Sequence, residues 1–270
     1  MKDLKKLLGI AFATMVSLWI LLPLYFITIL SFTDKSEIFR FPKHILPHKF
    51  SLEVIKFFLQ SHGTLASLLN SIIVAFFAIL IVLLISLPAA YALSRYRFRG
   101  RDSVMLFVLT SRMLPIPLLA IPLTNLYIAI RLYDNLLGVA FLHAAMAIPF
   151  AIIILSGIFV KISGDYEEAA YIFGASKMKA FFRVTLPLAL PGISAMLIFT
   201  FITSWNEVFA ASILTVENRT LSAHVLNVMQ ASPIYFKYAA GFFLSVPAII
   251  FIFLIRNYLF NMWGGFQSEK

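Results

Sequence analysis

Cysteine is absent from the 270 residues of this chain. Its absence excludes disulfide bonds, thiol catalysis and zinc sites with cysteine ligands. Charged residues are also scarce, because Asp, Glu, Lys and Arg together make up 13% of the chain, against about 25% in soluble domains. The sequence further lacks a Gly-rich phosphate loop followed by Lys, a His-x-x-x-His pair and a convincing nucleophile set. We therefore expect no enzyme activity, and no ATP, other cofactor or metal bound by this chain.

Apolar residues are correspondingly abundant, at 61% of the chain, and the mean hydropathy is +0.93. Soluble domains contain about 45–50% apolar residues. These values predict a polytopic membrane protein. A net charge of +10 could indicate that the chain binds nucleic acid. We expect none as a partner, because the basic residues flank apolar runs, where membrane lipid and the positive-inside rule account for them.

Apolar runs predict an all-α protein with six transmembrane helices, since a bilayer core takes about 20 helical residues. Prolines are expected to break the third run, and the loop at 32–62 to hold a short helix near 52–59. We divide the chain into residues 1–62, with the first span and an outer loop, and a core domain of five spans at 63–270. The six runs are residues 8–31, 63–94, 104–130, 135–160, 188–215 and 238–260.

The first run could instead be a cleaved signal peptide behind the basic start at residues 1–6. It is long for such a peptide, and no small-x-small cleavage site follows, so we favour a retained span. With six spans both termini share one side. Thirteen Lys and Arg residues then lie on the side of the C-terminal tail, from Lys2 to Lys270, and eight lie opposite, including Lys43. This bias predicts cytoplasmic termini in a multi-pass plasma or inner membrane protein.

A charged stretch, residues 161–187, separates the fourth apolar run from the fifth. We call this stretch the coupling loop. Asp165 and Glu168 have the spacing of a capping box at a helix start. Gly174 is expected to end that helix, because glycine readily adopts positive φ. Ser176 can cap a second helix, which we expect to end before Pro187.

The coupling loop resembles the EAA signature of ABC-importer permeases, in which this loop docks in a groove on a cytoplasmic ATPase. An amphipathic loop on the membrane surface is the simpler alternative. Many family members have an acidic residue at the position of Phe173, so the grip on the ATPase is expected to be more apolar here. The residues that the resemblance assigns to coupling are Glu168, Ala169, Ala170, Phe173, Gly174, Ala175, Ser176, Leu186 and Pro187.

Further motifs extend the resemblance to carbohydrate permeases of the maltose type, and to the maltose-system G subunit in particular. They include Ser94-Arg95-Tyr96-Arg97-Phe98-Arg99-Gly100, Trp205-Asn206-Glu207 and Arg219-Thr220-Leu221. The resemblance implies the MetI-like fold of type I importers and half of a translocation path. It also implies a second permease subunit, two ATP-binding subunits that hydrolyse ATP, and an extracytoplasmic sugar-binding protein.

Polar residues inside the spans allow two interpretations. Arg112, Asn206 and Glu207 either line or gate the sugar path or pair with another subunit, or they are structural hydrogen bonders between helices or snorkel to an interface. Trp205 either stacks on a sugar ring or belongs to the aromatic belt at the membrane interface. For His143 we favour the structural role.

The function also has alternatives. One is an ABC permease for another solute, such as glycerol phosphate or a polyol. A stand-alone channel or secondary carrier would need no ATPase. A membrane-embedded enzyme is the weakest alternative, because no convergent acid, base or metal set is present. The sequence does not name the sugar.

Overall fold

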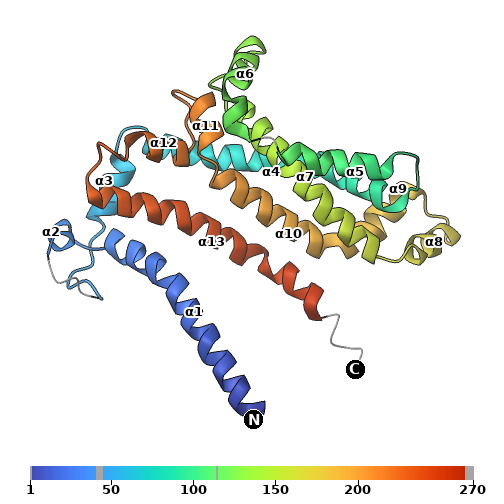
Figure 1. Ribbon diagram of the computed structural model, residues 1–270, viewed down its shortest axis with the longest axis horizontal. Coiled ribbons are helices and arrows are strands. Elements are labelled where there is room, and N and C mark those ends of the chain that lie inside the picture. The colour runs from blue at the N-terminus through green and yellow to red at the C-terminus, as the bar shows by residue number, and fades with distance from the viewer. Residues whose placement is uncertain (1, 41–44, 114, 265–270) are drawn as a thin grey trace. The chain divides into compact units, whose positions relative to one another are not determined.

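The computed structural model describes residues 2–40, 45–113 and 115–264 and is built of helices (Figure 1). Lys43 and Lys270, both counted for the orientation, lie outside these ranges. The short helix η1 is a 3-10 helix, and η2 is a π-helix. The elements are α1 (Lys2–Ser31), α2 (Lys35–Ile38), α3 (Glu53–Gln60), α4 (Thr64–Arg95), α5 (Arg101–Thr110), η1 (Ser111–Met113), α6 (Ile116–Ala129), α7 (Leu136–Lys161), α8 (Asp165–Ile172), α9 (Lys177–Ala180), η2 (Phe181–Thr185), α10 (Leu186–Trp205), α11 (Phe209–Leu214), α12 (Leu221–Val228) and α13 (Ile234–Gly264).

Five helical stretches are long and apolar enough to cross a membrane, and a sixth span results if one bent pair counts as one. The bent pair consists of residues 101–113 and α6, which differ in direction by 94°. It corresponds to the expected third span, where Pro115 precedes α6. A proline cannot donate a backbone hydrogen bond, so the helix is interrupted there as the sequence predicted. The other expected spans correspond to α1, α4, α7, the stretch 177–205 and α13.

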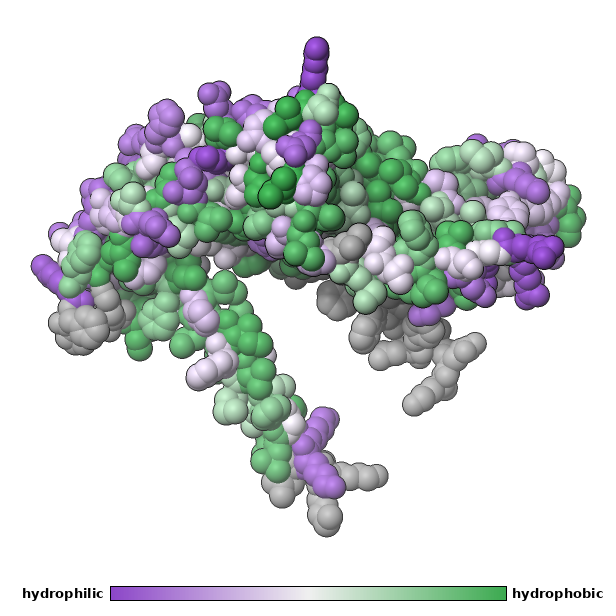
Figure 2. Space-filling model, turned by 45° about the horizontal axis from the view of Figure 1, so that its top comes forward, coloured by the Kyte–Doolittle hydropathy of each residue, from purple (hydrophilic) through white to green (hydrophobic). Residues whose placement is uncertain are grey.

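The chain divides into two compact units, the first made of residues 1–65 and 224–247. In this unit Phe58 of α3 is fully buried and packs against Phe236 and Phe243 of α13. Along α1, apolar side chains are exposed, among them Trp19 at 80%. Figure 2 shows this helix mostly green, that is hydrophobic, with a few pale side chains along it and strongly hydrophilic ones near its N-terminal end. Such a surface suits lipid or a protein partner within a membrane.

The second unit comprises residues 66–223 and 248–270 and contains the coupling loop. Its core is built around α7 and α10, which pack side by side (Figure 1). Small residues make this close approach possible. A Cβ atom added to Gly192 of α10 would lie 2.3 Å from Cγ1 of Ile158 on α7, so only glycine fits there. Alanines 144, 147 and 151 of α7 and Ala189 of α10 are likewise buried in this core.

Two boundaries in the second half of the chain differ from the expectation. The helix that begins at Lys177 does not end before Pro187 but continues through η2 into α10 as one stretch of 29 residues. Pro187 lies in the first turn of α10, directly after the π-helical turn, where a residue without an N–H is tolerated. The expected fifth span also stops early, because α10 ends at Trp205 and a separate helix, α11, follows.

Candidate functional site

The coupling loop folds into two short helices, α8 and α9, joined by a tight turn. Gly174 has φ +78°, and its N–H donates to the carbonyl of Tyr171 at 2.9 Å. The N–H of Ala175 donates to the carbonyl of Ala170, also at 2.9 Å. These two bonds form a Schellman motif, which satisfies the last carbonyls of α8 and requires a residue with positive φ. The helix end at Gly174 is therefore confirmed.

Of the two helix caps predicted for the loop, one is confirmed and the other is wrong. Ser176 caps α9, as predicted, since its hydroxyl accepts from the N–H of Lys179 at 3.3 Å. The predicted capping box of α8 is wrong. The cap of α8 is Gly164, which has no side-chain bond to the helix, and Asp165 already lies inside the helix. Its carboxylate instead accepts from the hydroxyl of Ser163 at 2.9 Å.

An apolar surface is exposed where α8 ends. Ile172 is 84% exposed and Phe173 is 91% exposed. Both residues lie at the end of the loop helix α8 and not in a membrane-spanning helix. Glu168 and Ala169 of α8 are also exposed. Large apolar side chains that extend into solvent at this level of exposure mark a surface for another protein or for lipid. The exposed residues of this turn thus form one candidate docking surface.

Glu167 points the other way and is 6% exposed. Its Oε1 accepts from Thr185 Oγ1 at 2.7 Å and from Arg95 Nε at 3.0 Å. Its Oε2 accepts from the phenol of Tyr91 at 2.7 Å, and the Tyr171 hydroxyl lies 3.4 Å away. We refer to Glu167, Tyr91, Arg95 and Thr185 as the Glu167 cluster. Sequence reasoning missed it, although Tyr91 and Arg95 are four residues apart and hence share one face of α4.

The charge state of Glu167 follows from these contacts. Burial by itself raises the pKa of the carboxyl group. Hydrogen bonds from Thr185 and Tyr91 and the positive charge of Arg95 act in the opposite direction and outweigh burial, so the pKa lies below its ordinary value. Glu167 is therefore an anion at neutral pH, paired with the guanidinium of Arg95.

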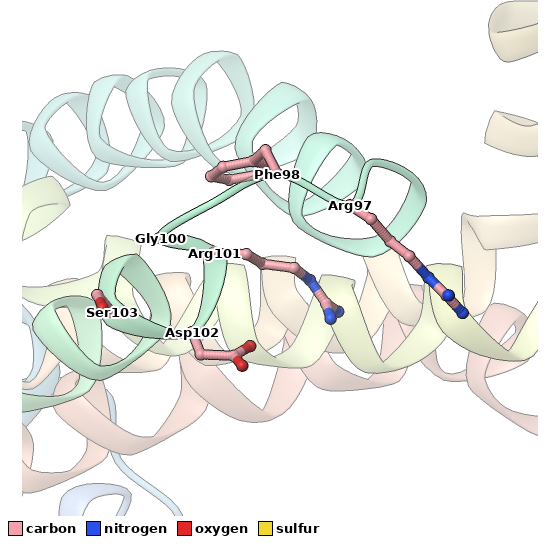
Figure 3. A pocket seen from close by; sticks show the side chains of 6 residues that line it. All are labelled: Arg97, Phe98, Gly100, Arg101, Asp102 and Ser103. Carbon is pink, nitrogen blue, oxygen red and sulfur yellow. The ribbon is translucent and has the colours of Figure 1, made fainter.

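A basic turn follows α4 and leads into α5. Gly100 has φ +92° and precedes the first residue of α5. The turn borders a hollow of about 550 Å³. Figure 3 shows the side chains of Arg97 and Arg101 extending from the turn in the same direction. Arg101 is held in place by a hydrogen bond from its Nε to the carbonyl of Leu93, at 2.6 Å. This arrangement presents positive charge beside the C-terminal end of α4.

Arg112 lies in η1 and is exposed. Its guanidinium carbon lies 5.4 Å from the ring centre of Phe150 on α7 and 5.9 Å from that of Phe199 on α10. The two rings stack on each other with centres 4.2 Å apart. A cation within about 6 Å of an aromatic face is attracted by the ring quadrupole. Arg112 is thus positioned by aromatic rings of the two packed helices.

Trp205, Asn206 and Glu207 lie at the break between α10 and α11. Trp205 is 2% exposed and stacks on Phe201, with ring centres 5.5 Å apart. Asn206, the C-cap of α10, is exposed.

Glu207 closes this break. Its carboxylate accepts from the backbone N–H groups of Ala210 and Ala211 at 2.8 and 2.9 Å, and so caps the start of α11. The same carboxylate lies 3.3 Å from Nε2 of His143. His143 is buried, and its Nδ1 lies 2.8 Å from the hydroxyl of Ser204. Glu207 therefore connects the break between α10 and α11 to α7. The Trp205-Asn206-Glu207 motif is the sequence feature that marks this break.

The described residues contain no group of three or more His, Cys, Asp or Glu side chains arranged to hold a metal ion. Among the described residues of the second unit, the largely buried carboxylates of Glu167 and Glu207 are engaged by hydrogen-bond donors of the protein. Both carboxylates thus make contacts between elements of this chain.

Similarity to known proteins agrees with this geometry. Residues 82–261 match the family described as binding-protein-dependent transport system inner membrane component. The trehalose transport system permease protein SugB of Mycobacterium tuberculosis is 31% identical over 71% of this chain and 72% of its own length. The inner membrane ABC transporter permease protein YcjP of Escherichia coli is 27% identical over 93% of this chain and 91% of its own length.

Among solved structures, a bacterial ABC transporter involved in the import of the acidic polysaccharide alginate contains a chain of the same fold. The TM-score is 0.75 at 21% sequence identity, with 93% of this chain and 96% of that chain covered. The expected MetI-like fold of an ABC-importer permease is thereby confirmed. Since the family match spans most of the sequence, the chain belongs to the family of binding-protein-dependent transport system inner membrane components.

Proposed function

We propose that this chain forms half of the translocation path of an ATP-driven carbohydrate importer and is moved by a cytoplasmic ATPase that grips the coupling loop. The observation that carries the proposal is the exposed turn of that loop. Ile172 and Phe173 extend from the end of α8 with more than four-fifths of their surface exposed. A partner that covers them gains the free energy of apolar burial, about 25 cal/mol per Å².

The carbohydrate substrate is supported by two similar proteins. SugB is named for trehalose transport, and the structurally similar transporter imports alginate. Both substrates are carbohydrates. The proposal includes four kinds of partner: a second permease subunit, two ATP-binding subunits, an extracytoplasmic sugar-binding protein and membrane lipid, which suits the exposed apolar residues of α1. Both termini are placed in the cytoplasm on the Lys and Arg count.

In this mechanism the permease pair alternates between an inward-facing and an outward-facing state. ATP can drive the change only because it binds one state more tightly than the other. Within this chain, the docked loop is continuous with α7 on one side and with the stretch 177–205 on the other. Arg112 and the Trp205-Asn206-Glu207 segment are the proposed contributors to the path, and Asn206 is the exposed member of that segment.

A Gly174→Val substitution tests the docking role. The left-handed conformation at this position costs a residue with a side chain about 1–2 kcal/mol, and more for a β-branched one. Among the residues that the structure describes, no atom lies within 4 Å of an added Cβ, so the strain is confined to the turn. In proteoliposomes with the partner subunits, we expect at least a fivefold loss of ATP-dependent sugar uptake. The matched control is Gly164→Ala, whose backbone has φ −61° and whose surroundings are equally open.

Three results would contradict the proposal. Uptake by Gly174→Val at the rate of the natural chain would refute docking through this turn. Uptake by the chain alone, without ATPase, would identify a secondary carrier or channel. A binding protein that co-purifies with the complex and carries glycerol phosphate or a polyol would refute the carbohydrate assignment.

A further inference from the structure

We propose that Glu167 is the positioning residue that transmits movement of the coupling loop to α4, a helix that is not adjacent to the loop in sequence. This inference rests on the proposed function, since it concerns how the docked loop moves the path. Glu167 is separated from Tyr91 by 76 residues and from Arg95 by 72. The connection between loop and α4 therefore depends on side chains.

The first argument is that α8 has a single buried residue, and that residue is Glu167. The other side chains of α8 are exposed or half-buried. An eight-residue helix is too short to be stable by itself in water. Its position is consequently determined by the few contacts it makes, and the carboxylate of Glu167 makes the most enclosed of them.

The second argument is that the Glu167 cluster brings four elements together. Tyr91 and Arg95 donate from α4, and Thr185 donates from the end of η2. Arg95 also donates through Nη1 to the carbonyl of Ile162, at 2.8 Å, where α7 ends. Loop helix α8 is thereby joined to α4, to the end of α7 and to the π-helical turn that leads into α10. π-Helical turns often occur at functional sites.

Aromatic packing closes the same junction. The ring of Tyr91 packs edge-on against Phe181 of η2 at 4.7 Å and against Phe159 of α7 at 5.7 Å. A packed and hydrogen-bonded junction has discrete arrangements and transmits displacement, whereas a solvated ion pair does not. The Glu167 cluster thus has the properties of a rigid joint.

The third argument is that the joint has little tolerance for loss of the carboxylate charge. The side chains of Glu167 and Arg95 are 7% and 15% exposed. Within the described residues, Arg95 Nη2 is already buried without a hydrogen-bond partner. Removing one member of a buried pair leaves the other charge uncompensated, so the remaining contacts rearrange.

Glu168, by contrast, is exposed on the adjacent position of α8. The two neighbouring glutamates have different roles in this proposal. Glu168 faces the ATPase, and Glu167 faces the membrane helices. A Glu167→Gln variant should therefore still dock on the ATPase but should move α4 poorly. Glu168→Gln is the matched control, because it makes the same chemical change one residue away on the exposed side.

The experiment measures sugar imported per ATP hydrolysed in proteoliposomes that contain the complete importer. For Glu167→Gln we expect ATPase subunits to co-purify as with the natural chain and the sugar-to-ATP ratio to fall about tenfold, within the usual range of coupling energies. For Glu168→Gln we expect weaker co-purification and an unchanged ratio in the complexes that remain. A merely structural role of Glu167 would lower both activities together and leave their ratio constant.

A second measurement uses the permease chain without ATPase, so it is independent of the proposed function. Hydrogen exchange of residues 162–176 should increase at least tenfold in Glu167→Gln and remain unchanged in Glu168→Gln. Should Glu167→Gln fail to fold, Thr185→Val and Tyr91→Phe each remove one bond and keep the shape, and each should lower the sugar-to-ATP ratio by a smaller factor. An unchanged ratio or unchanged exchange in the folded variants would overturn the proposal.

Discussion

Adjacent residues of the coupling loop have opposite environments. Successive positions of an α-helix are rotated by about 100°, so neighbours face different sides of the helix. Glu167 is buried among hydrogen-bond donors, and Glu168 is exposed. Residue type alone therefore does not distinguish a docking residue from a positioning residue. The exposure of the side chain and its hydrogen-bond partners distinguish them.

Protonation of Glu167 gives a prediction at this scale. Its pKa in the folded chain lies below the ordinary value of 4.5. The carboxylate therefore contributes stability that is complete above pH 4.5 and is lost as the pH falls through the lower folded value. Breaking a buried pair costs about 3 kcal/mol, so Glu167→Gln should melt at a lower temperature than the natural chain at neutral pH.

The measurement is the difference in melting temperature between the two chains, in detergent, from pH 7 to pH 3.5. We expect a constant difference down to about pH 4.5 and a decreasing one below it, because the natural chain then loses its charge. Glu168→Gln is the control and should show no comparable difference. A gap that closes already above pH 5.5 would mean that the pKa is raised, in conflict with the contacts described.

At the scale of elements, α7 and α10 pack closely against each other in the second unit. Gly192 has no room for a side chain, because an added Cβ would meet Cγ1 of Ile158 at 2.3 Å and its Cβ and Cγ2 at 2.9 Å. Ile158 is β-branched and stiff, so it cannot move aside without displacing its helix. The two helices that flank the coupling loop are thus held at a fixed distance.

Gly192→Ala should destabilise the chain by about 1–3 kcal/mol, the usual cost of overpacking. Thermal unfolding in detergent measures the effect. Gly157→Ala on α7 is the control, since no atom in the described part of the chain lies within 4 Å of its added Cβ. Ile158→Ala, which removes the clashing atoms, should restore part of the stability to Gly192→Ala. Equal melting of the two glycine variants would show that α7 and α10 are not closely packed at this point.

At the scale of the molecule, the topology can be tested without engineering a background, because the natural chain has no cysteine. Ser176 of the coupling loop and Glu217 after α11 are both exposed. In intact cells, a membrane-impermeant maleimide should label Glu217→Cys and leave Ser176→Cys unlabelled. After permeabilisation both should react, and bound ATPase should protect Ser176→Cys. Labelling of Ser176→Cys from outside would overturn the proposed orientation.

The membrane helices were largely predictable because their signals are local. A run of about 20 apolar residues predicts a membrane span, because the residues of the run alone decide its transfer into lipid. Prolines predict the break in the third span, because each lacks a backbone hydrogen-bond donor. The turn at Gly174 was predictable for the same reason, since positive φ is a property of one residue. The helix start at Asp165 was also predicted, but its capping was not, because the residue that caps α8 is Gly164 and not Asp165.

The sequence by itself thus determined that the chain is a membrane protein, where most of its spans lie and that a charged loop bends at Gly174. Only the tertiary structure decided that Glu167 faces inward to Tyr91 and Arg95, that the helix passes through Pro187, and that Glu207 meets His143 across 64 residues. The physical reason is range. Hydropathy and turn preference depend on residues within a few positions, whereas the partners of a buried charge depend on which distant helices pack around it.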